Sequence, residues 1–168
     1  MNSPRIILGI DPGLRHTGWG VVAQNGNRLS FIAAGRISPS ADLPMASRLL
    51  TLAEGIADIV RAHAPHESAI EETFVNKNAR SALLLGQARG SAMLALAQNG
   101  LTVAEYAANR IKQSVTGHGH AEKTQIQAMI AILLPTSGKL AADAADALAV
   151  AITHAHHGNV ASLREVQR

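Results

Sequence analysis

Two aspartates stand alone among alanines and aliphatic residues in the C-terminal part of the chain. Asp143 and Asp146 lie three residues apart in the run AADAADALAVAI, residues 141–152. This spacing predicts a helix that carries both carboxylates on one face, where they repel each other and where burial strengthens the repulsion. A divalent cation would remove the repulsion, because hard cations take oxygen ligands. Alternatively, the macrodipole at the helix N-terminus stabilises a carboxylate, which suits Asp143 better than Asp146.

Further carboxylates end two segments that are predicted to be strands. Asp11 follows the apolar residues 6–10, a run typical of a strand buried on both faces, although Asp11 could simply shape the turn that follows it. Residues 68–72 form a short strand that is reached through a helix and is therefore parallel to the first. Strand alternation turns Glu71 and Glu72 to opposite faces, so at most one of them joins Asp11.

The pattern around these residues predicts an α/β fold. Strands are expected over residues 6–11, 17–23, 28–37, 68–72 and 101–106, and helices over residues 45–64, 79–98, 107–115, 121–134 and 141–152. We expect one domain over residues 1–157, with a five-stranded mixed sheet flanked by helices, and a short C-terminal tail over residues 158–168. Three histidines, at positions 154, 156 and 157, are interpreted as a helix end.

Composition narrows the class of protein. The chain has 168 residues, of which 47% are hydrophobic, and this suits one domain with a substantial core. It has no cysteine, so disulfides and thiolate metal sites are excluded. No run of eighteen uncharged apolar residues is present, and we expect a cytoplasmic protein without a membrane span.

The donor types and the charge distribution suggest chemistry on a polyanion. Carboxylates without cysteine suit Mg²⁺ or Mn²⁺ better than Zn²⁺, and two such ions about 4 Å apart can activate a water and stabilise a leaving oxygen. Residues 77–123 contain six Lys and Arg side chains and two acids. This asymmetry favours nucleic acid as a partner, although a solvated helical surface would look the same. Together these features are typical of a nuclease.

The segment of residues 79–98 is predicted to be a long helix that is apolar almost all round. One face can pack on the sheet, and Gly86 and Gly90 on one side allow another backbone to come close. We therefore expect a homodimer, with two-fold symmetry, formed through this helix. The alternative is a helix wedged between the sheet and its own neighbouring helices.

Six segments in order carry a specific resemblance. They read ILGIDPG with TG (residues 7–13 and 17–18), AIE (69–71), LGQARG (85–90), EYAA (105–108), AEK (121–123) and DAADALA (143–149). With these segments the sequence resembles the RuvC family of Holliday-junction resolvases, within the ribonuclease H-like nuclease superfamily. The resemblance runs from residue 6 to about residue 154.

The resemblance implies which acids do the chemistry. It identifies the metal-binding catalytic residues as Asp11, Glu71, Asp143 and Asp146, and so selects Glu71 over Glu72. It implies two Mg²⁺ ions in each active site, with Mn²⁺ as a substitute. The implied reaction is the resolution of four-way DNA junctions by paired symmetric nicks, which leave 5′-phosphate and 3′-hydroxyl ends, in recombination and DNA repair.

The resemblance also implies DNA contacts and partners. Phe74 is expected beside the active site, where it can stack on a base near the junction centre, although it could instead fold onto the core. Lys112 and Lys123 match family positions that contact DNA near the scissile phosphate, and Lys77 is a weaker phosphate-binding candidate. The implied partners are a second copy of the chain, the four-way junction and the branch-migration proteins RuvA and RuvB. His118 and His120 have no clear counterpart.

Three other functions are compatible with parts of the sequence. The hairpin of residues 11–20 also resembles the phosphate-binding hairpin of actin-like ATPases, but those proteins need a second such hairpin and a longer chain. A junction-binding module without cleavage is the second alternative, and the complete carboxylate set speaks against it. The third is another ribonuclease H-like enzyme, which would cut RNA–DNA hybrids.

Overall fold

A five-stranded mixed sheet forms the centre of the protein. The computed structural model describes residues 3–72 and 78–165. The sheet has the order β3-β2-β1-β4-β5 and consists of β1 (Arg5–Asp11), β2 (Thr17–Asn25), β3 (Arg28–Ile37), β4 (Glu67–Glu71) and β5 (Val103–Tyr106). The first three strands form an antiparallel meander, and β4 and β5 continue the sheet parallel to β1. The predicted fold class is confirmed.

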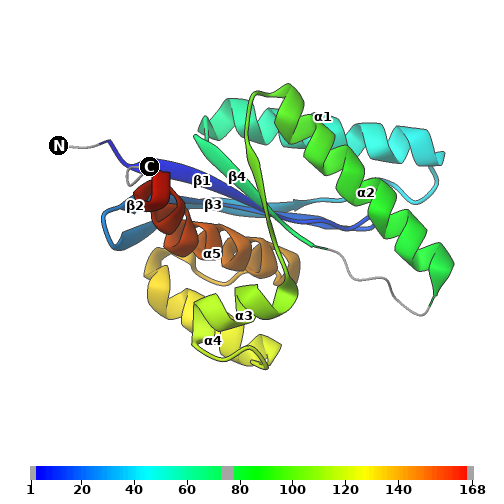
Figure 1. Ribbon diagram of the computed structural model, residues 1–168. Coiled ribbons are helices and arrows are strands. Elements are labelled where there is room, and N and C mark those ends of the chain that lie inside the picture. Colours follow the sequence, from blue (N-terminus) through cyan, green and yellow to red (C-terminus); the bar gives the residue numbers. More distant parts are fainter. Residues whose placement is uncertain (1–2, 73–77, 166–168) are drawn as a thin grey trace.

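Helices cover both faces of the sheet (Figure 1). One face carries α1 (Met45–His63) and α2 (Ala79–Gln98), and the other carries α5 (Ala142–Glu165) with α3 (Ala108–Thr116) and α4 (Lys123–Leu133). A short 3₁₀ helix, η1 (Pro135–Ser137), lies between α4 and α5. No helix among the described residues is both long enough and apolar enough to cross a membrane.

β1 is buried on both faces, as its apolar run predicts. Ile7 belongs to the apolar cluster on the α5 side, whereas Leu8 and Ile10 belong to the cluster under α1 and α2. Trp19 of β2 is partly buried and packs against the second cluster. Both helical layers are therefore held through the same central strand, whose last residue is Asp11.

The helix α5 lies close to the strands because glycines form the surface beneath it. Gly9 and Gly20 face each other across β1 and β2. A Cβ atom on Gly9 would come 2.2 Å from the carbonyl oxygen of Ala147, so any side chain there would push the helix away. The helix continues to Glu165, past residue 157, where the sequence analysis places the end of the domain. The histidines that were interpreted as a helix end therefore lie inside the helix.

Candidate active site

Asp11 and Glu71 are the last residues of two adjacent parallel strands. Ile10 of β1 is in register with Ile70 of β4, so the carboxylates that follow emerge side by side at one edge of the sheet. Glu71 is half-buried and lines a pocket with Asp11, whereas Glu72 is exposed. The structure thus places Glu71 in the site, a choice that strand alternation left open.

The turn after Asp11 is held by a buried threonine. The hydroxyl of Thr17 donates to the carbonyl oxygen of Gly13 at 2.7 Å, and the backbone N–H of Gly13 donates to the Thr17 oxygen at 3.2 Å. Thr17 is fully buried, so these bonds do not compete with water. They close the loop between β1 and β2 and fix the direction in which the chain leaves Asp11.

The two aspartates of α5 take different positions. Asp146 lines the same pocket as Asp11 and Glu71, a hollow of about 300 Å³. Asp143 does not line this pocket; its carboxylate lies 3.8 Å from Nη1 of Arg36 on β3 and borders a neighbouring hollow. Its negative charge nevertheless acts on Asp11. Three of the four expected acids therefore surround one pocket, and the fourth lies outside it, beside a neighbouring hollow.

The carboxyl group of Asp11 is strongly perturbed. Burial is the largest cause, followed by the negative charges of Glu71, Asp146 and Asp143, and together they raise its pKa from 3.8 to about 8, while Lys123 opposes the rise. Burial and Asp146 likewise raise the pKa of Glu71, against the two nearby lysines. Burial and the proximity of the carboxylates to one another therefore both disfavour the ionised forms of Asp11 and Glu71.

Two lysines from neighbouring helices face the carboxylates. Lys112 of α3 and Lys123, the first residue of α4, both line the pocket. The Nζ atom of Lys123 donates to Oδ2 of Asp146 at 3.3 Å, and this carboxylate is the main reason that the pKa of Lys123 is raised. The start of α4 is fixed by a capping box between Glu122 and Gln125, so the lysine is presented from a defined position.

The chemistry of the donor set fits a hard divalent cation. Every negatively charged group around the pocket is a carboxylate, the ligand type that such a cation prefers. The carboxylates of Glu71, Asp146 and Asp143 add to the effect of burial in raising the pKa of Asp11, and a bound cation would oppose both effects. Among residues 3–72 and 78–165, no three acidic or histidine side chains already converge as a formed metal centre. The fit therefore rests on donor type and charge.

Some predicted residues fall elsewhere. Phe74 and Lys77 lie outside the described residues. His118 and His120 are exposed on the loop before α4 and do not line the pocket.

Two arginines beside the carboxylates were missed by the sequence analysis. One is Arg36, beside Asp143. The other is Arg89 of α2, whose Nε donates to the carbonyl oxygen of Glu71 at 3.1 Å and whose Nη2 pairs with Glu105. Arg89 stands in the LGQARG segment, which was the only signal for it.

Strand order, the helices on both faces and the acids at the ends of β1 and β4 define a nuclease of the ribonuclease H-like class. The family model described as "Crossover junction endodeoxyribonuclease RuvC" matches residues 7–154. The chain belongs to this family, so the predicted family and enzyme class are confirmed. Enzymes of the family depend in general on a divalent metal ion.

Comparisons with individual proteins agree over nearly the whole length. The chain is 60% identical to the crossover junction endodeoxyribonuclease RuvC of Rhodopseudomonas palustris strain TIE-1, over 94% of this chain and 91% of that protein. It is 56% identical to the Bradyrhizobium diazoefficiens protein of the same name, over 98% and 94% of the two chains. A solved structure described as T. thermophilus RuvC in complex with Holliday junction substrate matches with a TM-score of 0.87 at 30% identity and covers 94% of this chain and 96% of that one.

Proposed function

We propose that the protein resolves four-way DNA junctions by hydrolysing one phosphodiester bond in each of two strands of like polarity. The observation that carries the proposal is the pocket itself, in which Asp11 and Glu71 from adjacent parallel strands meet Asp146 from α5 beside two lysines. Membership of the crossover junction endodeoxyribonuclease family supports this substrate, as does the junction complex of the T. thermophilus relative.

The carboxylates would hold the divalent ions, with Mg²⁺ as the physiological choice, Mn²⁺ as a substitute and two ions in each active site. The four residues that we assign to this role are Asp11, Glu71, Asp143 and Asp146. When bound, the metal supplies Lewis-acid stabilisation of the phosphate and lowers the pKa of an attacking water. Ion binding requires deprotonated carboxylates, so Asp11 must lose the proton that its surroundings favour in the metal-free protein.

The basic residues would hold and orient the scissile strand. Lys112 of α3 and Lys123 of α4 line the pocket together with the carboxylates, and their positive charges favour a phosphate bound beside them. The side chain of Lys123 is 76% exposed, so it can change its conformation to contact a bound phosphate without losing packing contacts. We further propose that Phe74 stacks on a base near the junction centre and that Lys77 contacts the backbone.

The outer face of α1 and α2 supports a homodimer. Leu83 and Leu94 of α2 are 64% and 59% exposed and Leu50 of α1 is 57% exposed. A Cβ atom built on Gly86 or Gly90 meets no atom within 4 Å, so a second backbone has room to approach. A two-fold dimer would present two active sites to two strands of like polarity. Sedimentation velocity should therefore detect a dimer, and Leu94→Glu should shift it to a monomer.

The remaining assignments follow from this activity. We propose that the protein works in the cytoplasm in recombination and DNA repair, with RuvA and RuvB as partners at the junction. We retain residues 1–157 as the nuclease domain and residues 158–168 as a C-terminal tail. Pull-down of RuvA and RuvB from the same organism on junction DNA would test the partnership.

A synthetic four-way junction and a linear duplex of the same sequences provide the decisive experiment. In Mg²⁺ the wild-type protein should produce paired symmetric nicks in the junction only. Asp143→Asn should bind the junction with unchanged affinity and lose cleavage. Junction binding without cleavage in Mg²⁺ and Mn²⁺ across several junction sequences would favour a binding module, and cleavage of an RNA–DNA hybrid instead would favour a different ribonuclease H-like activity.

A further inference from the structure

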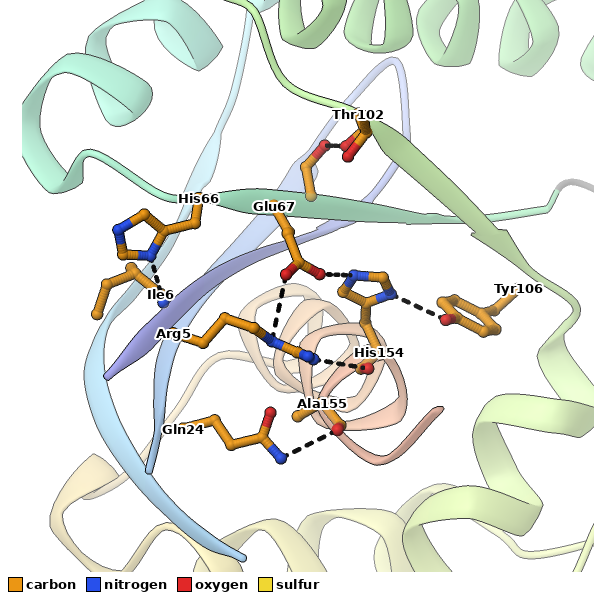
Figure 2. A network of polar contacts seen from close by, with 10 residues as sticks. Arg5, Ile6, Gln24, His66, Glu67, Thr102, Tyr106, His154 and Ala155 are labelled. Atoms are coloured by element: carbon orange, nitrogen blue, oxygen red, sulfur yellow. Dashed lines mark hydrogen bonds and ion pairs between the residues drawn. The ribbon is translucent and has the colours of Figure 1, made fainter. Parts of the chain in front are cut away.

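A second polar network lies further along α5 from the carboxylates and is centred on His154 (Figure 2). This histidine is only 8% exposed, and both of its ring nitrogens have partners. Nε2 lies 2.7 Å from a carboxylate oxygen of Glu67, and Nδ1 lies 2.9 Å from the hydroxyl oxygen of Tyr106. Eight residues separate His154 from Asp146, which corresponds to about 12 Å along the helix axis.

The hydrogen bonds of this network are donated in one order, from Tyr106 to His154 and from His154 to Glu67. Burial is the main reason that the pKa of His154 is lowered, so the neutral ring is favoured. A carboxylate accepts only, so the ring proton resides on Nε2 and is donated to Glu67. Nδ1 is then an acceptor, and the Tyr106 hydroxyl donates to it. Each of the three side chains therefore fixes the orientation of the next.

The same turn of α5 is bonded to two further strands. Arg5 of β1 donates from Nη2 to the carbonyl oxygen of His154 at 3.3 Å, and its Nε lies 3.4 Å from Glu67. Gln24 of β2 donates to the carbonyl oxygen of Ala155 at 3.1 Å. One helical turn is thus tied to β1, β2, β4 and β5.

Two of these strands, β1 and β4, carry carboxylates of the active site at their other ends. β1 runs from Arg5 to Asp11, and β4 runs from Glu67 to Glu71. Tyr106 is itself in register with Glu71 across β4 and β5. Any shift of α5 along the sheet would therefore change the network and the carboxylate spacing together.

Hydrophobic attraction alone favours no single position of α5 along the sheet, although the glycines beneath the helix limit where it can lie. The contact between α5 and the sheet consists of small and aliphatic side chains, and hydrophobic attraction has no preferred direction. Hydrogen bonds have narrow ranges of distance and angle. A buried polar network adds little to stability compared with apolar side chains of similar volume, but it can select one arrangement over its neighbours.

We propose that Tyr106, His154 and Glu67 are positioning residues for phosphodiester hydrolysis. They fix the place of α5 along the sheet, and so the distance of its aspartates from Asp11 and Glu71. The inference rests on the proposed function of the carboxylate pocket. None of the three residues touches the reacting atoms, so their effect is on metal binding and on the cleavage step.

Tyr106→Phe is the sharpest test, because it removes one oxygen atom and keeps the ring. Mn²⁺ binding would be measured by titration calorimetry, and cleavage of a pre-bound synthetic junction by single-turnover kinetics. We expect about tenfold slower cleavage and about tenfold weaker Mn²⁺ binding, with the junction Kd unchanged. His154→Gln keeps a donor toward Glu67 and should lie between the wild type and His154→Leu.

Thr153→Val is the matched control. Its buried hydroxyl is next to His154 in sequence but donates within α5, to the carbonyl oxygen of Ala149 at 2.8 Å. It should cleave and bind Mn²⁺ as the wild type does.

Three outcomes would count against the inference or separate it from the proposed function. Wild-type Mn²⁺ affinity and cleavage in Tyr106→Phe, with only a lower Tm, would overturn the positioning role. Equal losses in Thr153→Val would also overturn it, because they would report general loosening of α5. If the wild type cuts no junction, the proposed function fails, and the Mn²⁺ titrations of the variants still decide the positioning role.

Discussion

Gly18 of β2 lies directly beneath the main-chain carbonyl of Asp143, so that a Cβ atom at residue 18 would come 2.0 Å from that oxygen. Gly18 is also the residue that faces Asp11 across β1 and β2. The absence of a side chain therefore brings the first turn of α5 against the strand pair that ends in Asp11. One glycine connects the two elements that supply three of the four acids.

Gly18→Ala should accordingly lower the rate of cleavage more than it lowers the stability of the fold. The new methyl group must push the start of α5 away from the sheet, since the atom it meets belongs to the backbone. We expect cleavage to fall at least a hundredfold and the free energy of unfolding to fall by about 1–3 kcal/mol, measured by urea denaturation. Gly119→Ala is the control, because its Cβ would meet its nearest atom at 3.8 Å. Normal cleavage by Gly18→Ala would show that the close approach is not needed.

The carboxyl group of Asp11 should make the metal-free protein less stable as the pH rises. In the unfolded chain this group titrates near 3.8, but burial and neighbouring carboxylates raise its pKa to about 8 in the folded protein. The folded state therefore disfavours the ionised form, and the loss of stability begins near pH 4 and is complete above about pH 8. Asp11→Asn cannot ionise, so in EDTA its Tm should exceed that of the wild type by a margin that grows from pH 4 to pH 8.

Divalent metal should reverse the order of the two Tm values, so that the wild type becomes more stable than Asp11→Asn. A cation bound by the carboxylates stabilises the ionised site, so Mg²⁺ or Mn²⁺ should raise the Tm of the wild type at pH 8 and have little effect on Asp11→Asn. Binding should also release protons, which calorimetry in buffers of different ionisation enthalpy would detect. A Tm margin in EDTA that does not change with pH would contradict the raised pKa.

The sequence predicts the strands well because their ends coincide with strong local signals. Asp11 and Glu71 each end an apolar run, and Pro65 ends the preceding helix, since α1 stops at His63 with Ala64 in the left-handed region at φ 44°. The helices that cover the sheet also follow from their periodicity. Local patterns of this kind depend only on neighbouring residues, so they can be seen without the fold.

Long-range partners could not be predicted in the same way. Glu67 and His154 are 87 residues apart, and no local feature connects them. His154 follows Asp143 by eleven residues, a spacing that returns to the same side of a helix, but this becomes a signal only if the helix is known to continue. The role of the glycines under α5 could not be predicted from the sequence either, because the helix that each one accommodates lies more than a hundred residues further along the chain.

Lys123 should contribute to cleavage mainly through its charge. Its ammonium group bonds Asp146 at 3.3 Å and lowers the pKa of both Asp11 and Glu71. Lys123→Ala should slow single-turnover cleavage by about 10–100-fold and shift the rise of its rate with pH to higher pH, because the carboxylates then ionise later. Lys123→Arg keeps the positive charge and should therefore retain part of the wild-type cleavage rate. Lys139→Ala, at an exposed position that does not line the carboxylate pocket, is the control; an equal loss there would indicate a general effect of charge on DNA binding.

Arg89 should hold the backbone of Glu71 in place. Its Nε donates to the Glu71 carbonyl oxygen at 3.1 Å, while its Nη2 pairs with Glu105 of β5, so one guanidinium joins α2 to the ends of β4 and β5. Arg89→Met keeps a long side chain and removes both the hydrogen bond and the ion pair. We expect about tenfold slower cleavage and weaker Mn²⁺ binding. Glu105→Gln keeps the bond to Glu71 and should have a much smaller effect. If both variants lose activity equally, the ion pair between Arg89 and Glu105 is responsible for the effect on cleavage, and the hydrogen bond to the Glu71 carbonyl is not.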